Sequence, residues 1–392
     1  MTKKMKKKIK RNIRISCRNF SFYLLNYFFI IFCKLKPNRV LFLSDVRDVL
    51  DGNLKFLYDV VAEEEYEKIV LLKADRRYKR SFSEKFKLVY FLSTSKYILL
   101  DDYSKGISLM KVRKNQEVCQ LWHGAGAFKK FGYSRSDQKR RRKEDGHKNY
   151  TKAIVTSKEI KWCYSEAFGI DEDNVYVTGF PRTDVFFQQQ YIENKQKELY
   201  EEYPFLKEKK VILFAPTYRG NSLKRAYYDF EQLDLEKIYN ELHKDYVFIF
   251  KWHPGVFQNL KNDKLEFNFD QYKDFYYDLS DNRDINDLLL VTDVLVTDYS
   301  SVIFDYSLLN KPVVYFNYDF EEYEQDRGLY FPFEDYVYGE ISLNCDLLIE
   351  AIKKENLMPE KRKRFMEKFM IACDGNSTKK TYELIFEQKD NK

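Results

Sequence analysis

Glycine, proline, cysteine and histidine are all scarce in this 392-residue chain. Each scarcity limits the kinds of site and backbone motif that the chain can contain. It has 13 glycines and 8 prolines, so a motif in which they cluster indicates a specific backbone requirement. The six cysteines are scattered and form no CxxC pair, which argues against a structural zinc site and is typical of free thiols in a reduced compartment. Only four histidines occur, and two of them, His123 and His253, stand beside glycine or proline.

Several motifs of common enzyme classes are missing as well. The chain contains no Gly-rich Walker loop, no GxGxxG and no HExxH, and no DxD pair directly follows a predicted strand. These absences weaken the interpretation as an NTPase, a dehydrogenase, a metalloprotease or a metal-dependent sugar transferase. Asp101 and Asp102 are adjacent rather than spaced as in DxD, and we interpret them as the end of a strand.

The positive charge is concentrated near the N-terminus. The net charge is +7, lysines and arginines crowd residues 3–18, and no acidic residue precedes Asp45. Without this basic run the chain is close to neutral. A local basic tail does not require nucleic-acid binding, so we predict no nucleic-acid partner.

A stretch of aromatic and aliphatic residues, 20–33, follows the basic run. It is shorter than the roughly 20 residues of a spanning helix, and no small-residue cleavage site of a signal peptide follows it. We therefore predict that residues 1–36 associate with an anionic membrane surface, with the protein peripheral at the cytoplasmic face. The alternative is an ordinary amphipathic helix packed on the protein after a disordered basic tail.

From Arg39 onward, short continuous apolar runs alternate with amphipathic helical stretches. Continuous apolar runs are typical of parallel strands buried on both faces, and helical spacers indicate βαβ crossovers. The predicted strands form two series, 40–44, 68–72, 97–100, 118–122, 153–156 and 175–178, then 211–214, 246–250, 294–297 and 312–315. We predict an α/β fold of two Rossmann-like domains facing a cleft, residues 37–190 and 191–392, with ligands at the carboxyl ends of the strands.

Two polar motifs follow strands of the first series. Trp122-His123-Gly124 ends one strand. There, glycine lets the backbone approach a ligand, and a neutral imidazole can take a proton from an attacking hydroxyl. A buried histidine that supports a turn is the alternative. The second motif, residues 179–184, contains Arg182, which either contacts a phosphate or forms a structural ion pair.

Two further motifs follow strands of the second series. Arg219 stands in the run Ala215–Gly220, and its guanidinium suits bidentate phosphate recognition. Pro254 fixes the backbone beside His253, which either donates hydrogen bonds to a pyrophosphate or packs at a strand end.

A longer segment, residues 284–306, is predicted as helix, strand and the start of another helix. Thr297, Asp298, Ser300 and Ser301 lie at that start, where free backbone N–H groups and hydroxyls form an anion site. Simple helix capping is the alternative. Arg327 adds a further cation after the last predicted strand.

These motifs, in this order, resemble the CDP-glycerol glycerophosphotransferase family of teichoic-acid enzymes. The matching pieces are WHG at 122–124, GFPRTD at 179–184, APTYRG at 215–220, WHP at 252–254, TDYSSVIFDY at 297–306 and RGLYF at 327–331.

The resemblance implies a GT-B-like fold attached peripherally to the membrane, with no required metal and no cofactor. It also implies transfer of glycerol phosphate or ribitol phosphate from CDP-glycerol or CDP-ribitol to a lipid-linked teichoic-acid or capsule polymer, with release of CMP. His123 is then similar to the family's general base. His253, Ser300, Ser301 and Arg327 are similar to its pyrophosphate ligands, and His253 is predicted as catalytic together with His123. Gly124, Arg182 and Thr297 are further predicted substrate-binding residues, and Arg219 and Asp298 are weaker assignments of the same kind.

Three alternatives stay open at this point. Within the transferases, the chain length favours a primase or a short polymerase. A GT-B glycosyltransferase or epimerase on the same scaffold predicts a nucleotide-sugar donor and no CMP. A non-catalytic membrane-surface protein predicts that His123 and His253 are structural.

Overall fold

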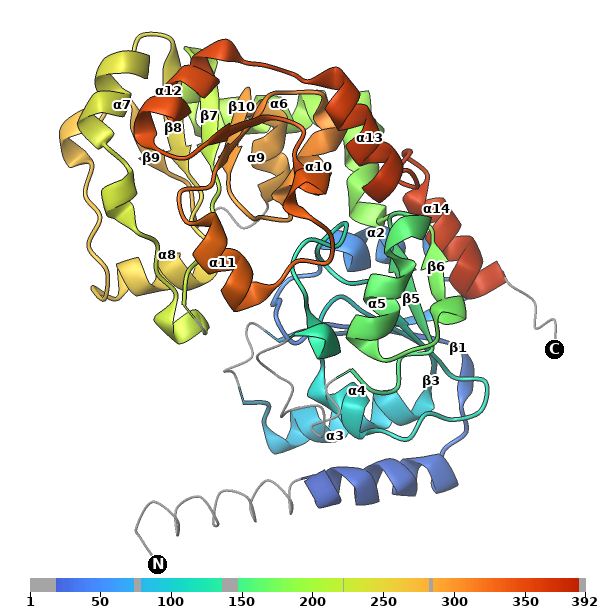
Figure 1. The fold of residues 1–392 in the computed structure, drawn as a ribbon. Helices are drawn as coiled ribbons and strands as arrows, with labels where there is room; N and C mark the ends of the chain where they lie inside the picture. The colour runs from blue at the N-terminus through green and yellow to red at the C-terminus, as the bar shows by residue number, and fades with distance from the viewer. Residues whose placement is uncertain (1–18, 74–78, 136–146, 221, 282–284, 388–392) are drawn as a thin grey trace, which may run out of the picture. The chain divides into compact units, whose positions relative to one another are not determined.

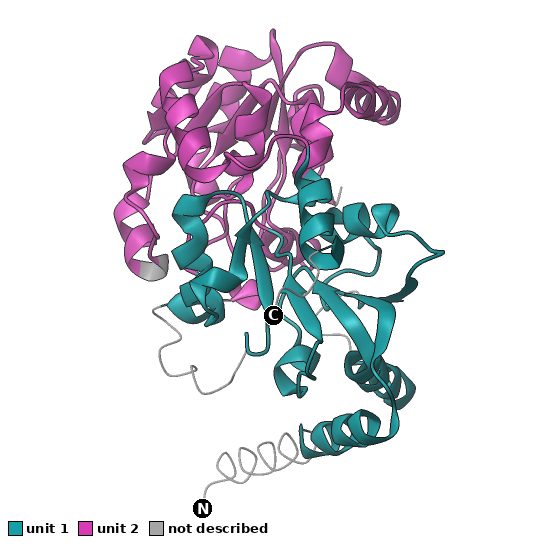
Figure 2. Ribbon diagram, turned by 90° about the vertical axis from the view of Figure 1, so that its right-hand side faces the viewer, with its two compact units in different colours: residues 1–123, 131–182, 376–392 teal, residues 124–130, 183–375 magenta. Residues whose placement is uncertain are grey.

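The computed structural model describes residues 19–73, 79–135, 147–220, 222–281 and 285–387. The predicted basic tail, residues 1–18, lies outside this range, and so do the side chains of Asp326 and Arg327. The chain divides into two compact units, coloured separately in Figure 2. Unit 1 comprises residues 1–123, 131–182 and 376–392, and unit 2 comprises residues 124–130 and 183–375.

Neither unit is one continuous stretch of the chain. The chain leaves unit 1 after His123, returns at Phe131, and leaves again after Arg182. The predicted ranges 37–190 and 191–392 differ from the units at this boundary. The segment 124–130 belongs to unit 2 although it lies in the first predicted range. Residues 376–392 belong to unit 1 although they lie in the second predicted range.

Unit 1 contains a six-stranded parallel sheet with the strand order β2-β1-β3-β4-β5-β6. The strands are β1 (Lys36–Leu43), β2 (Glu67–Leu71), β3 (Ser95–Leu100), β4 (Glu117–Gln120), β5 (Lys152–Val155) and β6 (Val175–Val177). The helices are the N-terminal helix (residues 19–32), α2 (Gly52–Val60), α3 (Phe82–Thr94), α4 (Lys105–Leu109), α5 (Lys161–Phe168) and α14 (Ser377–Tyr382).

Unit 2 contains a second parallel sheet of six strands, in the order β12-β11-β10-β7-β8-β9. The strands are β7 (Lys210–Phe214), β8 (Tyr246–Phe250), β9 (Tyr276–Asp278), β10 (Val294–Thr297), β11 (Val313–Phe316) and β12 (Glu340–Ser342). The helices are α6 (Gln189–Glu202), α7 (Leu235–Leu242), α8 (Pro254–Lys261), α9 (Ile285–Val291), α10 (Val302–Tyr306), α11 (Phe320–Arg327), α12 (Cys345–Lys354) and α13 (Pro359–Phe369) (Figure 1).

Both sheets confirm the predicted α/β class and all ten predicted strands. Successive side chains of β8, β10 and β11 are buried, which means that both faces of the sheet are covered, as continuous apolar runs require. The unpredicted strands, β9 and β12, have three residues each and lie at the sheet edges. Each contains an acidic residue, so neither forms the continuous apolar run by which the other strands were predicted.

Local sequence signals fix the helix ends. Ser81 and Glu84 form a reciprocal capping box at the start of α3, which satisfies two otherwise free amides. Gly169 ends α5 in the left-handed conformation that favours glycine at this position.

The strand orders locate the positions where ligands bind in such sheets. Unit 2 has the doubly wound Rossmann order, which reverses direction between β7 and β10, and unit 1 reverses between β1 and β3. At such a reversal the crossover helices diverge to opposite faces and leave a crevice at the carboxyl ends of the strands. In unit 2, Arg219 follows β7 and Ser300 follows β10, the two strands at the reversal; in unit 1, His123 follows β4, the neighbour of β3.

Candidate active site

His123 lies at the carboxyl end of β4 in unit 1, with 45% of its side chain exposed. Its Nδ1 is 3.2 Å from the carbonyl oxygen of Asp101, the first residue after β3. Because a carbonyl oxygen only accepts hydrogen bonds, Nδ1 carries the proton of the neutral ring. Nε2 is then the unprotonated nitrogen, which is the state required of a base.

Two acidic residues stand behind this histidine. The Asp102 carboxylate is 3.9 Å from His123 Nδ1, close enough to stabilise the imidazolium that forms when the ring takes a proton. Arg47 Nε donates to the buried carboxylate of Asp101 over 2.7 Å. Burial raises the pKa of Asp101, and the charge of Arg47 opposes that shift. Interpreting Asp101 and Asp102 only as a strand end therefore missed their role around His123.

The backbone before His123 has an unusual conformation. Trp122 has a φ of +54°, a region that costs a bulky residue roughly 1–3 kcal/mol. The buried side chain of Asn53, in the first turn of α2, donates to the carbonyls of Leu121 and Trp122 over 3.1 and 2.9 Å. Asn53 also accepts from the backbone N–H of Arg182 over 3.0 Å, so it joins the two predicted motifs of unit 1.

In unit 2, His253 forms the N-cap of α8. Its Nδ1 accepts a hydrogen bond from the backbone N–H of Gly255 over 3.1 Å, which places the proton of the neutral ring on Nε2. The preceding Trp252 is buried, and its backbone N–H donates to Ser280 Oγ over 2.7 Å. The two candidate histidines thus adopt opposite tautomers: His123 has a free base nitrogen and His253 a donor.

The predicted anion site after β10 divides into buried and accessible residues. Thr297 and Asp298 are completely buried. Thr297 Oγ1 donates to the Ala215 carbonyl, and Asp298 Oδ1 accepts from the Thr217 N–H, so both side chains hold the loops after β7 and β10 together. Ser300 and Ser301 are half-buried, and Ser301, the N-cap of α10, makes no side-chain capping bond.

Arg219 is buried and engaged by two carboxylates. Its guanidinium pairs with both oxygens of Asp319 at 2.5 and 2.8 Å and with Asp298 at 2.8 Å. Burial by itself would lower the pKa of Arg219, but Asp298 and Asp319 raise it overall, so the group stays charged. Direct phosphate binding by Arg219 stays a prediction; the observed contacts are those of a residue that positions the loops.

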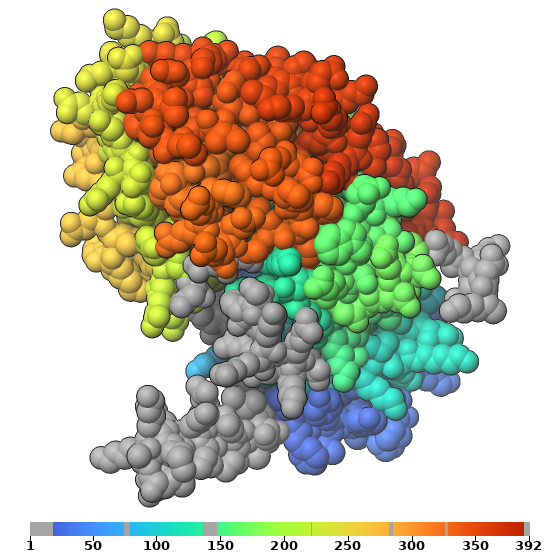
Figure 3. Space-filling model, viewed as in Figure 1, coloured from blue at the N-terminus to red at the C-terminus, as the bar shows by residue number. Residues whose placement is uncertain are grey.

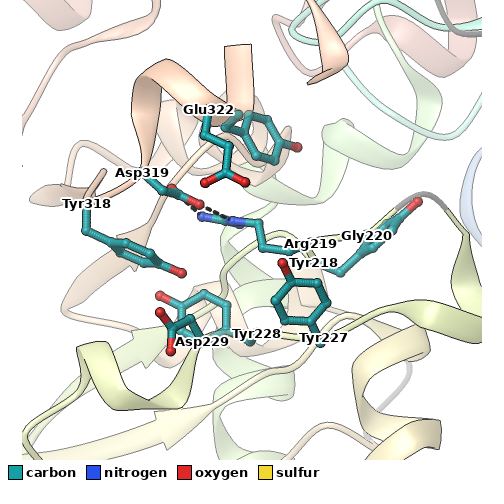
Figure 4. A pocket seen from close by; sticks show the side chains of 10 residues that line it. Tyr218, Arg219, Gly220, Tyr227, Tyr228, Asp229, Tyr318, Asp319 and Glu322 are labelled. Carbon is teal, nitrogen blue, oxygen red and sulfur yellow. Dashed lines mark hydrogen bonds and ion pairs between the residues drawn. The ribbon is translucent and has the colours of Figure 1, made fainter. Parts of the chain in front are cut away.

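A pocket of about 230 Å³ lies beside Arg219 in unit 2 (Figure 4). Tyrosine rings and the carboxylates of Asp229, Asp319 and Glu322 line it. One of the rings, Tyr218, is 4.5 Å from the His253 ring, centroid to centroid. The tyrosine lining is Tyr218, Tyr227, Tyr228, Tyr318 and Tyr323. This pocket offers stacking surfaces and hydrogen-bond acceptors rather than a site for an anion.

The segment that follows His123 is anchored on unit 2. Gly124 begins it, and Lys129 pairs with Leu329 in an antiparallel bridge directly after Arg327 and Gly328. Gly126 has a φ of +64°, and a Cβ there would lie 2.2 Å from the ring of Phe304. This glycine is therefore needed for close packing.

Metal-ligating side chains do not converge in the described ranges: no group of three or more His, Cys, Asp or Glu could hold an ion there. The five cysteines within the same ranges are free thiols.

A sequence model described as CDP-Glycerol:Poly(glycerophosphate) glycerophosphotransferase matches residues 25–387. The chain belongs to this family. The family assignment agrees with the order of the motifs along the chain and with the two parallel sheets that carry them.

Two bacterial relatives and one solved structure extend the comparison. The chain is 43% identical over 367 residues to the teichoic acid poly(ribitol-phosphate) polymerase of Bacillus spizizenii, which covers 91% of this chain and 57% of the relative. It is 34% identical over 364 residues to the teichoic acid ribitol-phosphate primase of the same species, covering 90% and 91%. The wall teichoic acid polymerase TagF has the same fold, with a TM-score of 0.75, 22% identity, and coverage of 99% of this chain and 98% of that one.

Proposed function

We propose that this family member transfers an alditol phosphate from a CDP-alditol to a hydroxyl of a membrane-linked teichoic-acid polymer and releases CMP. The observation that carries the proposal is the pair of opposite tautomers at His123 and His253. One ring can take a proton from an attacking hydroxyl and the other can donate a hydrogen bond to a phosphate oxygen, and both tasks assist phosphoryl transfer.

On the acceptor side, the hydroxyl oxygen of the polymer attacks the phosphorus that bears the alditol. His123 Nε2 takes the hydroxyl proton, and the bond from that phosphorus to the bridging oxygen breaks, so that CMP leaves. Asp102 stabilises the charge that His123 gains, because its carboxylate lies 3.9 Å from Nδ1.

On the donor side, Ser300, Ser301 and His253 Nε2 bind the pyrophosphate, and Arg327 contributes charge there. The hydroxyl of Ser301 is not used for capping, and α10 has only five residues, so hydroxyls and amides matter more here than a helix dipole. The tyrosine pocket next to His253 accommodates the uncharged part of the donor, since its carboxylates repel phosphate.

The relatives favour ribitol phosphate over glycerol phosphate as the group transferred. Both curated relatives named above act on ribitol phosphate by their descriptions, and one is a polymerase and the other a primase. The chain spans 57% of the polymerase and 91% of the primase, so we propose ribitol phosphate transfer and assign neither role.

The first test measures CMP release by the purified protein with CDP-ribitol or CDP-glycerol and a lipid-linked acceptor. We expect CMP that depends on the acceptor and forms faster from CDP-ribitol. A faster reaction with CDP-glycerol would contradict the choice of alditol. No CMP from either donor, with turnover of a UDP- or GDP-sugar instead, would support the glycosyltransferase alternative and overturn the proposal.

We also propose that the N-terminal helix attaches the protein to the cytoplasmic face of the membrane. None of the described helices combines the length and apolarity needed to cross a bilayer. The helix instead turns apolar side chains outward: Leu24, Ile31 and Phe32 are 56%, 72% and 71% exposed, and the helix lies at the surface of unit 1 (dark blue in Figure 3).

The inward face of this helix is held by a polar residue. Asn26 is fully buried; it donates to Ser93 Oγ over 2.7 Å and accepts from the Lys111 N–H over 2.9 Å. Phe29 on the same face is also buried and packs against the rings of Phe86 and Tyr90. An ordinary amphipathic helix packed on a protein exposes polar side chains on its outer face, so the apolar side chains exposed here support an interfacial helix. Phe82 on α3, 82% exposed, adds an apolar side chain on a second helix.

Vesicle sedimentation tests the membrane proposal. We expect binding to phosphatidylglycerol vesicles that is weaker on neutral vesicles and is lost in the double variant Ile31→Ser/Phe32→Ser. The matched control is Leu343→Ser/Ile371→Ser, which removes two similarly exposed apolar residues (58% and 60%) from unit 2. Equal loss of binding in both double variants would contradict a specific role for the helix.

A further inference from the structure

We propose that Asn53 is a positioning residue that sets the backbone of both His123 and Arg182. The proposal rests on the proposed function, because it matters for catalysis only if His123 takes the proton of the acceptor hydroxyl. Asn53 itself is buried, with 2% exposure, and it acts through neighbouring backbone groups rather than by touching a substrate.

The amide of Asn53 contacts three backbone groups in two segments of unit 1. Its Nδ2 donates to the carbonyls of Leu121 and Trp122, at the end of β4, over 3.1 and 2.9 Å. Its Oδ1 accepts from the N–H of Arg182 over 3.0 Å. Two carbonyls and one N–H need two donors and one acceptor in one plane, and a primary amide supplies this combination.

The left-handed conformation of Trp122 makes this support necessary. With φ at +54°, the carbonyls of Leu121 and Trp122 turn toward the same amide nitrogen. Gln120 Oε1 accepts from the Trp122 N–H over 3.0 Å on the other side. Because His123 is the next residue, the direction of its Cα–Cβ bond depends on this held conformation.

The aromatic rings around Trp122 depend on its backbone conformation as well as on the orientation of its own ring. The Trp122 ring lies 5.0 Å from the Phe131 ring in a stacked arrangement and 4.4 Å from the His123 ring. If the Trp122 backbone relaxed to a negative φ, the ring would leave this stack and His123 Nδ1 would lose the Asp101 carbonyl at 3.2 Å.

Asn53→Asp is the sharpest perturbation because it keeps the shape and replaces the two donors by an acceptor. The matched control is Asn149→Asp. Asn149 Nδ2 also donates to two carbonyls, those of Ile107 and Met110, over 2.8 and 2.7 Å, but neither carbonyl belongs to residues 121–123. Asn53→Ser is the second variant, which retains one donor and adds no charge.

Steady-state CMP release and thermal unfolding are measured for all three variants. We expect kcat of Asn53→Asp to fall by about tenfold to a hundredfold while the donor KM stays within about twofold, because the proposed donor ligands belong to unit 2. The kcat of Asn53→Ser is expected to lie between those of Asn53→Asp and the wild type, and the kcat of Asn149→Asp is expected to equal that of the wild type. Wild-type kcat in Asn53→Asp, or a loss matched by Asn149→Asp and explained by unfolding, would overturn the proposal.

A second readout separates this proposal from the proposed function. The chain has four histidines, so ¹⁵N-histidine spectra are simple, and His123→Ala assigns the signals of that ring. We expect Asn53→Asp to shift the ring nitrogens of His123 away from the Nδ1-protonated tautomer and to leave those of His253 unchanged. Unchanged His123 signals would overturn the positioning role, even if the wild type released no CMP.

Discussion

Replacing Arg219 by methionine decides whether this residue binds phosphate or holds the loops of unit 2. The guanidinium neutralises Asp298, whose side chain is 1% exposed, and Asp319, which is 16% exposed. Methionine keeps much of the side-chain length but leaves both carboxylates without their cation. Removing one partner of a buried ion pair costs about 3–5 kcal/mol.

That cost converts into a large fall in the unfolding temperature. For a domain the size of unit 2, 1 kcal/mol shifts the midpoint by about 2–4 °C, so we expect a decrease on the order of 10 °C. The double variant Arg219→Met/Asp319→Asn is expected to recover part of this loss, because it removes one of the unpaired charges. Scanning calorimetry measures both, with exposed Arg225→Met on the same loop as the control.

The phosphate-ligand hypothesis predicts the opposite pattern. A lost charged hydrogen bond to a phosphate is worth about 1.5–3 kcal/mol, which corresponds to a donor affinity weaker by roughly 10- to 150-fold, with little change in unfolding temperature. If Arg219→Met unfolds like the wild type and only donor affinity falls, the assignment of Arg219 as a positioning residue is wrong. The original prediction of a phosphate ligand would then stand.

Three other expectations concern single side chains. His123→Ala is expected to abolish CMP release with an unchanged donor dissociation constant, whereas His253→Ala weakens donor binding as well; wild-type rates in both, in folded protein, would refute the site. Burial raises the pKa of Asp101, so its stabilising contribution is present below the ordinary value of 3.8 and is lost as the pH rises through the higher folded-state value. Asp101→Asn should therefore gain stability relative to the wild type as the pH rises above about 4, measured by urea unfolding; a constant difference would contradict this sign. Gly126→Ala places a methyl group against Phe304 and should cost at least about 2 kcal/mol in urea unfolding; unchanged stability would show that the segment repacks freely.

The sequence alone determined ten of the twelve strands, the fold class and the family. The apolar runs such as Val211–Phe214 are continuous because both faces of a parallel sheet are covered, and this leaves a direct trace in the order of residues. The motifs at His123, His253 and Ser300 are equally local, because each follows a strand within a few residues. The short edge strands β9 and β12 left no such trace.

Only the tertiary structure decided what the polar residues of the site do. Arg219 and Asp298 stand in separate motifs, and the sequence predicted both as substrate-binding residues. In the fold they form an ion pair with each other, because the carboxyl ends of β7 and β10 are neighbours in the sheet. Asn53 carries no motif at all; it gained a role because α2 brings its amide to backbone groups of residues 121, 122 and 182. Contacts across such separations depend on sheet order and helix packing, which no local pattern of residues records.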